Sequence, residues 1–369
     1  MRKITYIYQA GRAERMQNME SSAKEFFYGY FYMKEQLKDV NFLEFNVNTD
    51  KFLRKYFNQF LRKISGLPFF SDLILSKAYR KTLLNSKTIV CTNQRVGFSI
   101  LLFLWINSQK NINSVVFVMG LFNNNPKNLI KKFFRKNFII LFMRTFKKII
   151  FLSSGEFQYV NKFYPQYKNK IHFLPFSIDQ NFWTADITSE KEVSKKSVLF
   201  IGNDGKRDYD FVIRLAKEMP KIKFTFITKQ IKNKELLSKN VTLLSGKWDD
   251  LNISDSDIKK VYQNSSISII PIIKSLQPSG QSVALQSLSM GVPVLITVSE
   301  GFWEPNLYED NKNIIFVENN KINLWKEKIE NILKDTSKLN EIRTQGKKLV
   351  MENNNLEIFS QKLKKIIES

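Results

Sequence analysis

One stretch, residues 277–296 (QPSGQSVALQSLSMGVPVLI), constrains the fold more than any other, because it joins a turn, a helix and a buried strand with few spare residues. Pro278, Ser279 and Gly280 interrupt the preceding apolar run and predict a turn. Apolar residues then recur at helical positions up to Gly291, which is typical of a helix end. The run 293–296 is short, apolar and bounded by polar residues, which favours a parallel strand covered on both faces.

The start of this predicted helix is its chemical feature. The first backbone N–H groups of a helix have no partners within it, and with the helix dipole they place about half a positive charge at that end. A phosphate group fits there. Gly280 lets a ligand approach the backbone, and Ser279, Gln281 and Ser282 offer neutral side-chain hydrogen bonds. The alternative is structural, with Ser279 as an N-cap and Gly280 as a turn residue.

Length and composition favour two α/β domains. The chain has 369 residues, 43% of them hydrophobic, which is enough for two cores of similar size. The single cysteine, Cys91, excludes an internal disulfide and indicates a reducing compartment. We expect no signal peptide, because the strand-length run 4–8 is followed at once by Gly11 and Arg12. The longest apolar run, 98–106, is too short to span a bilayer, so we expect a soluble or peripheral protein.

The formal charge of +24 is large enough to attract polyanions such as nucleic acid, anionic lipid or charged glycan. Two segments, 52–64 and 127–148, interleave aromatic residues with cations at helical spacing. Such a helix can lie in the interface of an anionic membrane, or its aromatic face can pack on the sheet. The basic residues predicted to meet the membrane or the acceptor from these segments are Lys55, Arg62, Lys132 and Arg135.

The remaining pattern predicts alternating strands and helices. The predicted strands are 4–8, 88–91, 114–119, 149–152, 171–174, 197–201, 224–228, 241–244 and 267–273, and the predicted helices include 23–37, 97–106, 209–218 and amphipathic helices from 323 onward. Strand, helix, strand in this order indicates parallel crossovers. The polar stretch 177–197 is predicted to link two domains.

The loop after strand 197–201 is the second candidate binding element. It contains Asn203, Lys206 and Arg207 and follows the first strand of the predicted second domain. Loops at the carboxyl ends of parallel strands border the ligand crevice of an open sheet. Arg207 can pair a diphosphate with forked hydrogen bonds, and Lys206 can act as a point charge. A solvated turn is the alternative.

Two motifs resemble the GT-B glycosyltransferases, especially the retaining, sugar-nucleotide-dependent enzymes of family 4 (group 1-like). The run 286–294 (QSLSMGVPV) is similar to the second half of the family's donor-site motif. The segment 170–183 resembles the strand that closes the first domain. Gln286 stands where the family usually has the glutamate that holds the ribose. Gln277 or Pro278 stands where it has the glutamate that contacts the donor sugar.

The resemblance implies two Rossmann-like domains with a cleft between them and a C-terminal helix that crosses back to the first. The boundaries are then 1–180 for the acceptor domain, 195–352 for the donor domain and 353–369 for the returning helix. It implies a UDP-sugar as donor substrate, no bound cofactor and no required metal. The implied catalytic residues are Gln277, Lys206 and Arg207, and the implied donor-binding residues are Asn203, Lys206, Arg207, Trp248, Ser279, Gly280, Gln281, Ser282 and Gln286.

The first loop faces the cleft in this family, so Arg12 and Arg15, with Glu20 and Glu25, are candidate acceptor contacts. For each of them taken singly, an ordinary surface charge is the favoured alternative. Trp248 can stack on uracil or simply pack. The only histidine, His172, lies in an apolar strand and is predicted to be structural.

The leading hypothesis is a glycosyltransferase acting on a lipid-linked or cell-envelope glycan acceptor at the cytoplasmic face of the membrane. Nucleic acid is not the expected partner. A basic nucleic-acid-associated protein and a GT-B protein that binds without catalysis are the alternatives, the latter because Gln286 replaces the usual glutamate.

Overall fold

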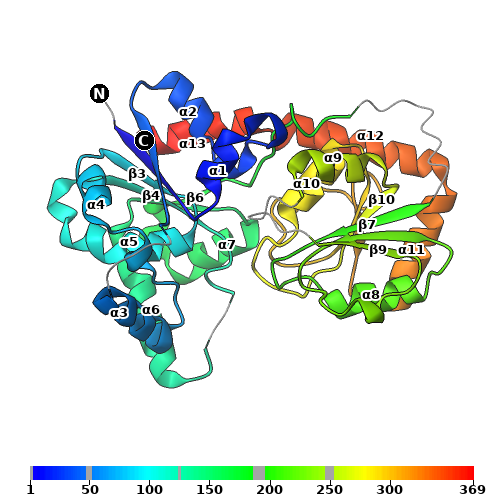
Figure 1. Cartoon of the computed structure of the whole chain (residues 1–369), viewed down its shortest axis with the longest axis horizontal. Helices are drawn as coiled ribbons and strands as arrows, with labels where there is room; N and C mark the ends of the chain where they lie inside the picture. Colours follow the sequence, from blue (N-terminus) through cyan, green and yellow to red (C-terminus); the bar gives the residue numbers. More distant parts are fainter. Residues whose placement is uncertain (1–2, 47–51, 124–125, 186–195, 246–252) are drawn as a thin grey trace. The chain divides into compact units, whose positions relative to one another are not determined.

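The computed structural model describes residues 3–46, 52–123, 126–185, 196–245 and 253–369. It divides into two compact units, one made of residues 1–17, 26–175 and 359–369 and the other of residues 18–25 and 176–358. Each unit is a parallel six-stranded sheet with helices on both faces (Figure 1), so both are Rossmann-like, as predicted.

The first unit has the strand order β2-β1-β3-β4-β5-β6. Its strands are β1 (Ile4–Tyr8), β2 (Val40–Glu44), β3 (Thr88–Cys91), β4 (Asn113–Val118), β5 (Lys148–Phe151) and β6 (Ile171–Phe173). Its helices are α1 (Arg12–Gln17), α2 (Tyr30–Gln36), α3 (Phe52–Ser65), α4 (Lys77–Leu84), α5 (Gln94–Ile106), α6 (Leu129–Thr145), α7 (Ser154–Phe163) and most of α13 (Leu356–Glu368). The strands β1, β3 and β4 are almost entirely buried, as expected where helices cover both faces of the sheet.

The second unit has the order β12-β11-β10-β7-β8-β9. Its strands are β7 (Ser197–Ile201), β8 (Lys223–Ile227), β9 (Val241–Leu244), β10 (Ile267–Ile270), β11 (Val294–Thr297) and β12 (Ile315–Val317). Its helices are α8 (Tyr209–Lys217), α9 (Asp255–Gln263), α10 (Gln281–Ser289), α11 (Ile322–Lys334) and α12 (Thr336–Asn353). The turn, helix and strand predicted for 277–296 are therefore confirmed as α10 and β11.

Side-chain caps fix several helix starts at the carboxyl edges of the sheets. Asn93 caps α5, Ser153 caps α7 and Asp208 caps α8, each by accepting a backbone N–H from the first turn. Helix α13 packs within the first unit, where the side chain of Asn113 donates to the carbonyl of Ile367 over 2.9 Å and Phe359 stacks on Phe117. The predicted return of the last helix to the first domain is thus confirmed.

The predicted helix 23–37 is wrong in its first half. The chain forms short 3-10 turns at Met19–Ser21 and Glu25–Phe27, and the α-helix begins only at Tyr30. Gly29, with φ 74°, adopts the left-handed conformation immediately before that start, which a continuing helix cannot accommodate. As a result residues 18–25 pack with the second unit.

Candidate functional site

The loop between β7 and α8 is folded back on itself by Arg207. A Cβ atom at Gly202 would lie 2.5 Å from Cγ of Arg207, so glycine is needed for the arginine to cross the strand end. Asn203 anchors the loop to the end of β8 by accepting the backbone N–H of Lys229 over 2.7 Å. The loop therefore holds Arg207 in one place before any ligand arrives.

Arg207 is buried without being fully paired. Its side chain is 3% exposed, and Nη1 donates to Oδ2 of Asp204 over 2.8 Å. Its Nε has no hydrogen-bond partner within the described residues. Burying a charged donor without a partner is unfavourable, so such a group is suited to receive an anion.

The start of α10 lies against this guanidinium. Gly280 has φ 88°, and a Cβ atom there would lie 2.6 Å from Cγ2 of Ile270 and 3.5 Å from Nη2 of Arg207. The hydroxyl of Ser279 is buried, and no residue in the described ranges is its hydrogen-bond partner. We call this arrangement of Arg207, Ser279, Gly280 and the first turn of α10 the phosphate cradle.

The cradle combines two sources of positive potential in one unit. The N–H groups of the first turn of α10 have no acceptors within the helix, and the helix dipole adds to the charge of Arg207. The backbone of Lys206 runs beside the segment after β10, where its carbonyl accepts the N–H of Ile273 over 2.9 Å. The Lys206 side chain is half-buried in the same loop. Gly280 and Arg207 therefore lie next to each other in the second unit.

The other predicted donor-site residues lie around the same turn. Gln277 is half-buried, and its carbonyl accepts the N–H of Ser279 over 2.7 Å. Gln281 is buried and Ser282 half-buried in the first turn of α10. Trp248 lies outside the described residues.

Gln286, one turn further along α10, belongs to a buried hydrogen-bond network. Its Nε2 donates to Oε1 of Glu25 over 2.8 Å, and its Oε1 accepts the hydroxyl of Tyr262 over 3.3 Å. Nε1 of Trp183 also donates to Oε1 of Glu25, over 2.7 Å. Burial, and next the charge of Asp255, raises the pKa of Glu25 to about 7, against the lowering effect of these hydrogen bonds.

The prediction that Glu25 contacts the acceptor from the first domain is therefore wrong. It is 1% exposed and belongs to the second unit, where its partners lie. A buried indole N–H and a buried amide each need an acceptor, but nothing near Glu25 in the sequence identifies Trp183 or Gln286 as the groups that need it. Only the three-dimensional contact reveals the role.

Arg12 and Arg15 lie on α1 of the first unit. The N–H groups of Arg12 and Ala13 both donate to Oε2 of Glu44 over 2.7 Å, and Nε of Arg12 donates to the carbonyl of Phe26 over 3.4 Å. Burial lowers the pKa of the Arg12 guanidinium to about 10. Arg15 is buried as well.

The four predicted membrane cations separate into two kinds. Lys55 and Lys132 are exposed. Arg62 is half-buried and donates from Nη1 to the carbonyl of Phe69 over 2.6 Å. Placing Arg135 on the membrane face is wrong, because its side chain is buried and Nη2 donates to the carbonyl of Leu121 over 2.6 Å.

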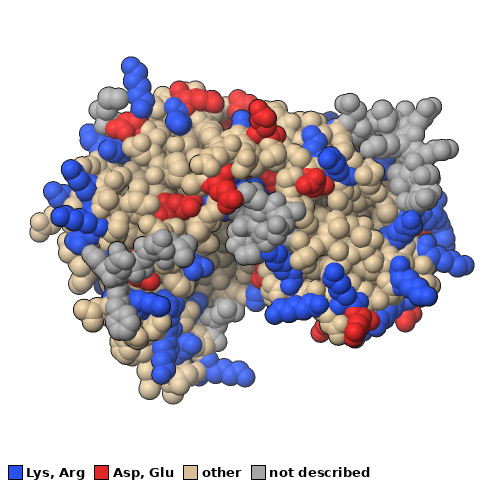
Figure 2. Space-filling view, viewed as in Figure 1, with Lys and Arg blue, Asp and Glu red and all other residues tan. Residues whose placement is uncertain are grey.

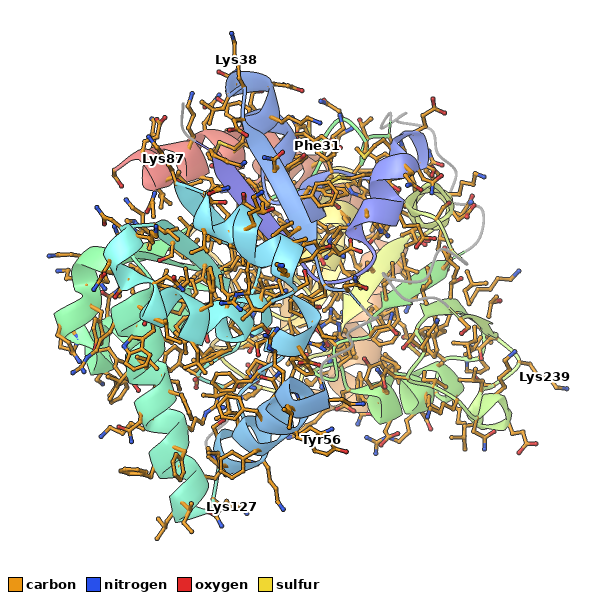
Figure 3. The ribbon with its side chains drawn as sticks, turned by 60° about the vertical axis from the view of Figure 1, so that its left-hand side comes forward. Phe31, Lys38, Tyr56, Lys87, Lys127 and Lys239 are labelled. Carbon is orange, nitrogen blue, oxygen red and sulfur yellow. The ribbon has the colours of Figure 1, made fainter. Side chains whose placement is uncertain are left out.

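Helices α3 and α6 pack side by side and leave an apolar face uncovered (Figure 3). Leu53 is 85% exposed and Leu129 is 79% exposed. The α3–α6 surface comprises Leu53, Tyr56, Phe57, Phe60, Leu129, Ile130 and Phe133, with the exposed cations Lys55, Lys63, Lys132 and Lys136 among them. Figure 2 shows cations over this part of the first unit and also on the second unit, so the positive charge is not confined to one region.

Two features are absent from the described residues. None of their helices is both long enough and apolar enough to cross a bilayer. They contain no group of three or more His, Cys, Asp or Glu side chains placed to hold a metal ion.

A family model described as glycosyl transferases group 1 matches residues 183–349. Solved structures similar to the whole chain include sucrose-phosphate synthase from Thermosynechococcus elongatus, at 12% identity and TM-score 0.73, with 100% of this chain and 98% of that chain covered. They also include Anabaena Alr3699/HepE in complex with UDP and glucose, at 11% identity, TM-score 0.67 and full coverage of both chains. A glycosyltransferase from Rickettsia africae has 15% identity and TM-score 0.66, with 100% and 98% covered. The sequence comparison with curated proteins gives no match.

Proposed function

We propose that this chain, a glycosyltransferase with a group 1 domain, moves a sugar from a UDP-sugar to a lipid-linked or cell-envelope glycan acceptor at the cytoplasmic face of the membrane. The observation that carries the donor half is the phosphate cradle, where the buried and incompletely paired Arg207 meets the glycine start of α10. A nucleoside diphosphate supplies the anion that this arrangement lacks.

The chemistry follows from where charge develops. The bond between the anomeric carbon and the diphosphate oxygen breaks, a bond from that carbon to an acceptor hydroxyl oxygen forms, and the acceptor proton passes to the departing phosphate. The leaving diphosphate gains negative charge as the bond breaks, and Arg207 with the first turn of α10 stabilises it. The proposed reaction requires no metal, because this positive potential stabilises the leaving diphosphate. It retains configuration, because an acceptor that gives its proton to the departing phosphate approaches the anomeric carbon from the same face.

The choice of UDP rests on comparison. The Anabaena HepE structure contains UDP and glucose, and the fold is shared over the full length of both chains. The family match covers the domain that contains the cradle.

Donor binding is tested by calorimetry with UDP, UMP and uridine, followed by a UDP-release assay with a panel of UDP-sugars. We expect UDP to bind at least about tenfold more tightly than UMP, because the second phosphate reaches the cradle. Arg207→Gln should lower turnover about 100-fold, the loss typical of one preorganised donor to a developing anion. Arg214→Gln, which removes an exposed arginine from α8, is the matched control and should leave turnover unchanged. Equal affinity for UDP and uridine would contradict the proposal.

The acceptor half is supported by the α3–α6 surface. Exposed aromatic and aliphatic side chains lie on it beside lysines, which is the composition of a helix face that enters the headgroup region. Each lysine near an anionic surface contributes about 1 kcal/mol. A lipid-linked acceptor would be met at that surface.

Sedimentation with anionic and neutral liposomes tests the membrane half. We expect binding to anionic liposomes that weakens at least about 30-fold in Lys55→Glu/Lys132→Glu, since two contributions of about 1 kcal/mol are lost and two unfavourable charges are added. The control Lys217→Glu/Lys239→Glu makes the same charge change at exposed positions of the second unit and should bind as the wild type does. Identical partition of both double variants would reject the membrane half and leave the donor half intact.

A further inference from the structure

We propose that Glu25 is a positioning residue of the donor site: its carboxylate holds the amide of Gln286 and thereby fixes the first turn of α10, where the phosphate cradle lies. This inference rests on the proposed function, because it assigns a residue to the same donor site. Glu25 touches no substrate in this account and acts through α10.

The carboxylate is placed for one task. Oε1 of Glu25 accepts Nε1 of Trp183 over 2.7 Å and Nε2 of Gln286 over 2.8 Å, while Oε2 accepts the N–H of Asp179 over 3.4 Å. Glu25 is 1% exposed and Gln286 is 7% exposed, so water does not compete for these bonds. Two side chains and one backbone group thus converge on a single buried acid.

The network reaches the cradle through Tyr262. Its hydroxyl lies 3.3 Å from Oε1 of Gln286 and also 3.3 Å from the carbonyl of Val283, in the first turn of α10. Because Nε2 must face the carboxylate, the Gln286 amide has one orientation, and its oxygen meets the tyrosine. Burial raises the pKa of Tyr262, the charge of Glu25 raises it further and the charge of Arg207 opposes the rise, so the buried acid and the cradle cation both act on this hydroxyl.

The network also explains why position 286 is glutamine. A glutamate there would place a second carboxylate about 2.8 Å from the first, in a site that already contains the neighbouring charge of Asp255. Two carboxylates so close cannot both ionise, and one would take up a proton. Glutamine donates the required hydrogen bond without adding charge.

The groups that face Glu25 define its electrostatics. Asp255 raises its pKa and accepts the N–H of Ala23 over 2.9 Å, while Asp179 accepts the N–H of Lys24 over 3.2 Å. Tyr262 lies beyond Gln286, and Arg207 lies within electrostatic range of that tyrosine. Burial, and next the charge of Asp255, raises the pKa of Glu25 to about 7.

The test uses steady-state kinetics on the full chain, with a UDP-sugar that the UDP-release assay identifies as a donor. Glu25→Ala should raise KM for the donor about 10- to 30-fold, the loss expected for a hydrogen bond to a charged group, with kcat within about twofold. Glu25→Gln keeps an oxygen at the position of Oε1, so its KM should stay within about threefold of the wild type. Glu235→Ala removes an exposed acid from the second unit and is the matched control.

A second variant, Gln286→Glu, separates an effect on the donor site from a failure to fold, because the same protein is compared at two pH values. Gln286→Glu should have a near-normal donor KM at pH 5.5, where the pair shares a proton, and a KM at least about tenfold higher at pH 8.5. A KM profile for Gln286→Glu parallel to that of the wild type would overturn the inference, as would an unchanged KM in Glu25→Ala. If the wild type binds no UDP-sugar, the proposed function fails and this inference fails with it. If the wild type uses a UDP-sugar but the Glu25 and Gln286 variants have the same donor KM as the wild type, this inference fails and the proposed function stands.

Discussion

Two buried arginines, Arg135 of the first unit and Arg207 of the second, differ in how fully their side chains are paired. Arg135 of the first unit donates to the carbonyls of Leu121 and Gly66 over 2.6 and 3.4 Å, at the loop that follows β4. Arg207 of the second unit donates to Asp204 and leaves Nε without a partner within the described residues. Both are buried, so burial does not distinguish them. The Nε of Arg207 distinguishes them, because it is a buried donor without a partner within the described residues. A phosphate oxygen could accept from it, as the proposed function requires.

The two buried glutamates make the same distinction. Glu156 accepts the backbone N–H groups of Gly120 and Phe122 over 2.8 and 3.0 Å and so holds the loop after β4. Glu25 instead accepts from the side chains of Trp183 and Gln286. Burial raises the pKa of each to about 7. One acid fixes a backbone loop, and the other fixes side chains beside a proposed site.

The largest expected effect is on Arg207. Arg207→Met should weaken UDP binding by about 3 kcal/mol, or about 100-fold, because the charge-assisted bonds to phosphate are lost. Its free energy of unfolding should be unchanged or higher, because an incompletely paired buried charge is removed. Calorimetry with UDP and urea unfolding measure both. A variant that unfolds more readily yet binds UDP normally would reverse the comparison.

The converse is expected for Arg135. Arg135→Met leaves the buried carbonyl of Leu121 without its donor and should lower the free energy of unfolding by about 2 kcal/mol, with UDP affinity unchanged. Lys136→Met, at an exposed position of the same helix, should change stability by less than about 0.5 kcal/mol. If Arg135→Met weakened UDP binding tenfold at full stability, Arg135 would be a ligand-binding residue after all.

Gly280 and Gly205 form the next pair. Both have positive φ, but a Cβ atom at Gly280 would lie 2.6 Å from Ile270, whereas nothing lies within 4 Å of one at Gly205. Gly280→Ala should therefore destabilise by about 1–2 kcal/mol and weaken UDP binding, while Gly205→Ala should show the smaller backbone effect alone. Thermal melts with and without UDP separate the two. Equal UDP affinities would place the phosphates away from α10.

The smallest effect concerns pH. The folded pKa of Glu156 is raised from 4.5 to about 7, so the folded protein retains a proton that the unfolded chain releases between these values. Its contribution to stability is fully present below about pH 4.5 and is lost as the pH rises through about 7. Glu156→Gln should flatten this decline by up to about 1 kcal/mol per pH unit. Urea unfolding at several pH values measures it, and an unchanged slope would argue against the raised pKa.

The sequence predicted the sheets well where strands are buried on both faces. The bounds of β1, β3 and β7 match the predicted runs, because largely apolar runs mark interior strands of a sheet. The bounds of the edge strand β9 also match, although its residues are only partly buried or exposed. Strand β2 was not predicted, since Asn41 and Glu44 interrupt its apolar pattern at the edge of the sheet. The helix predicted from residue 23 failed because Tyr28 and Gly29 take positive φ, which no periodicity reveals.

The candidate site was predicted in part for similar reasons. The cradle joins two local motifs, a glycine turn before a helix and a basic loop after a strand, and parallel topology brings such ends together. The burial of Arg135 could not be foreseen, because its spacing on α6 is that of the exposed lysines beside it. The environment of Glu25 could not be predicted either, because its partners Trp183 and Gln286 lie more than 150 positions away in the sequence.

Residues 18–25 have a practical consequence for anyone who divides this protein. They belong to the second unit although the chain on either side belongs to the first. A recombinant fragment spanning only residues 176–358 would lack Glu25, and the indole of Trp183 and the amide of Gln286 would remain in the interior with no acceptor. Chimeras built by exchanging halves of the chain at a single junction would have the same defect unless residues 18–25 are transferred together with the second unit.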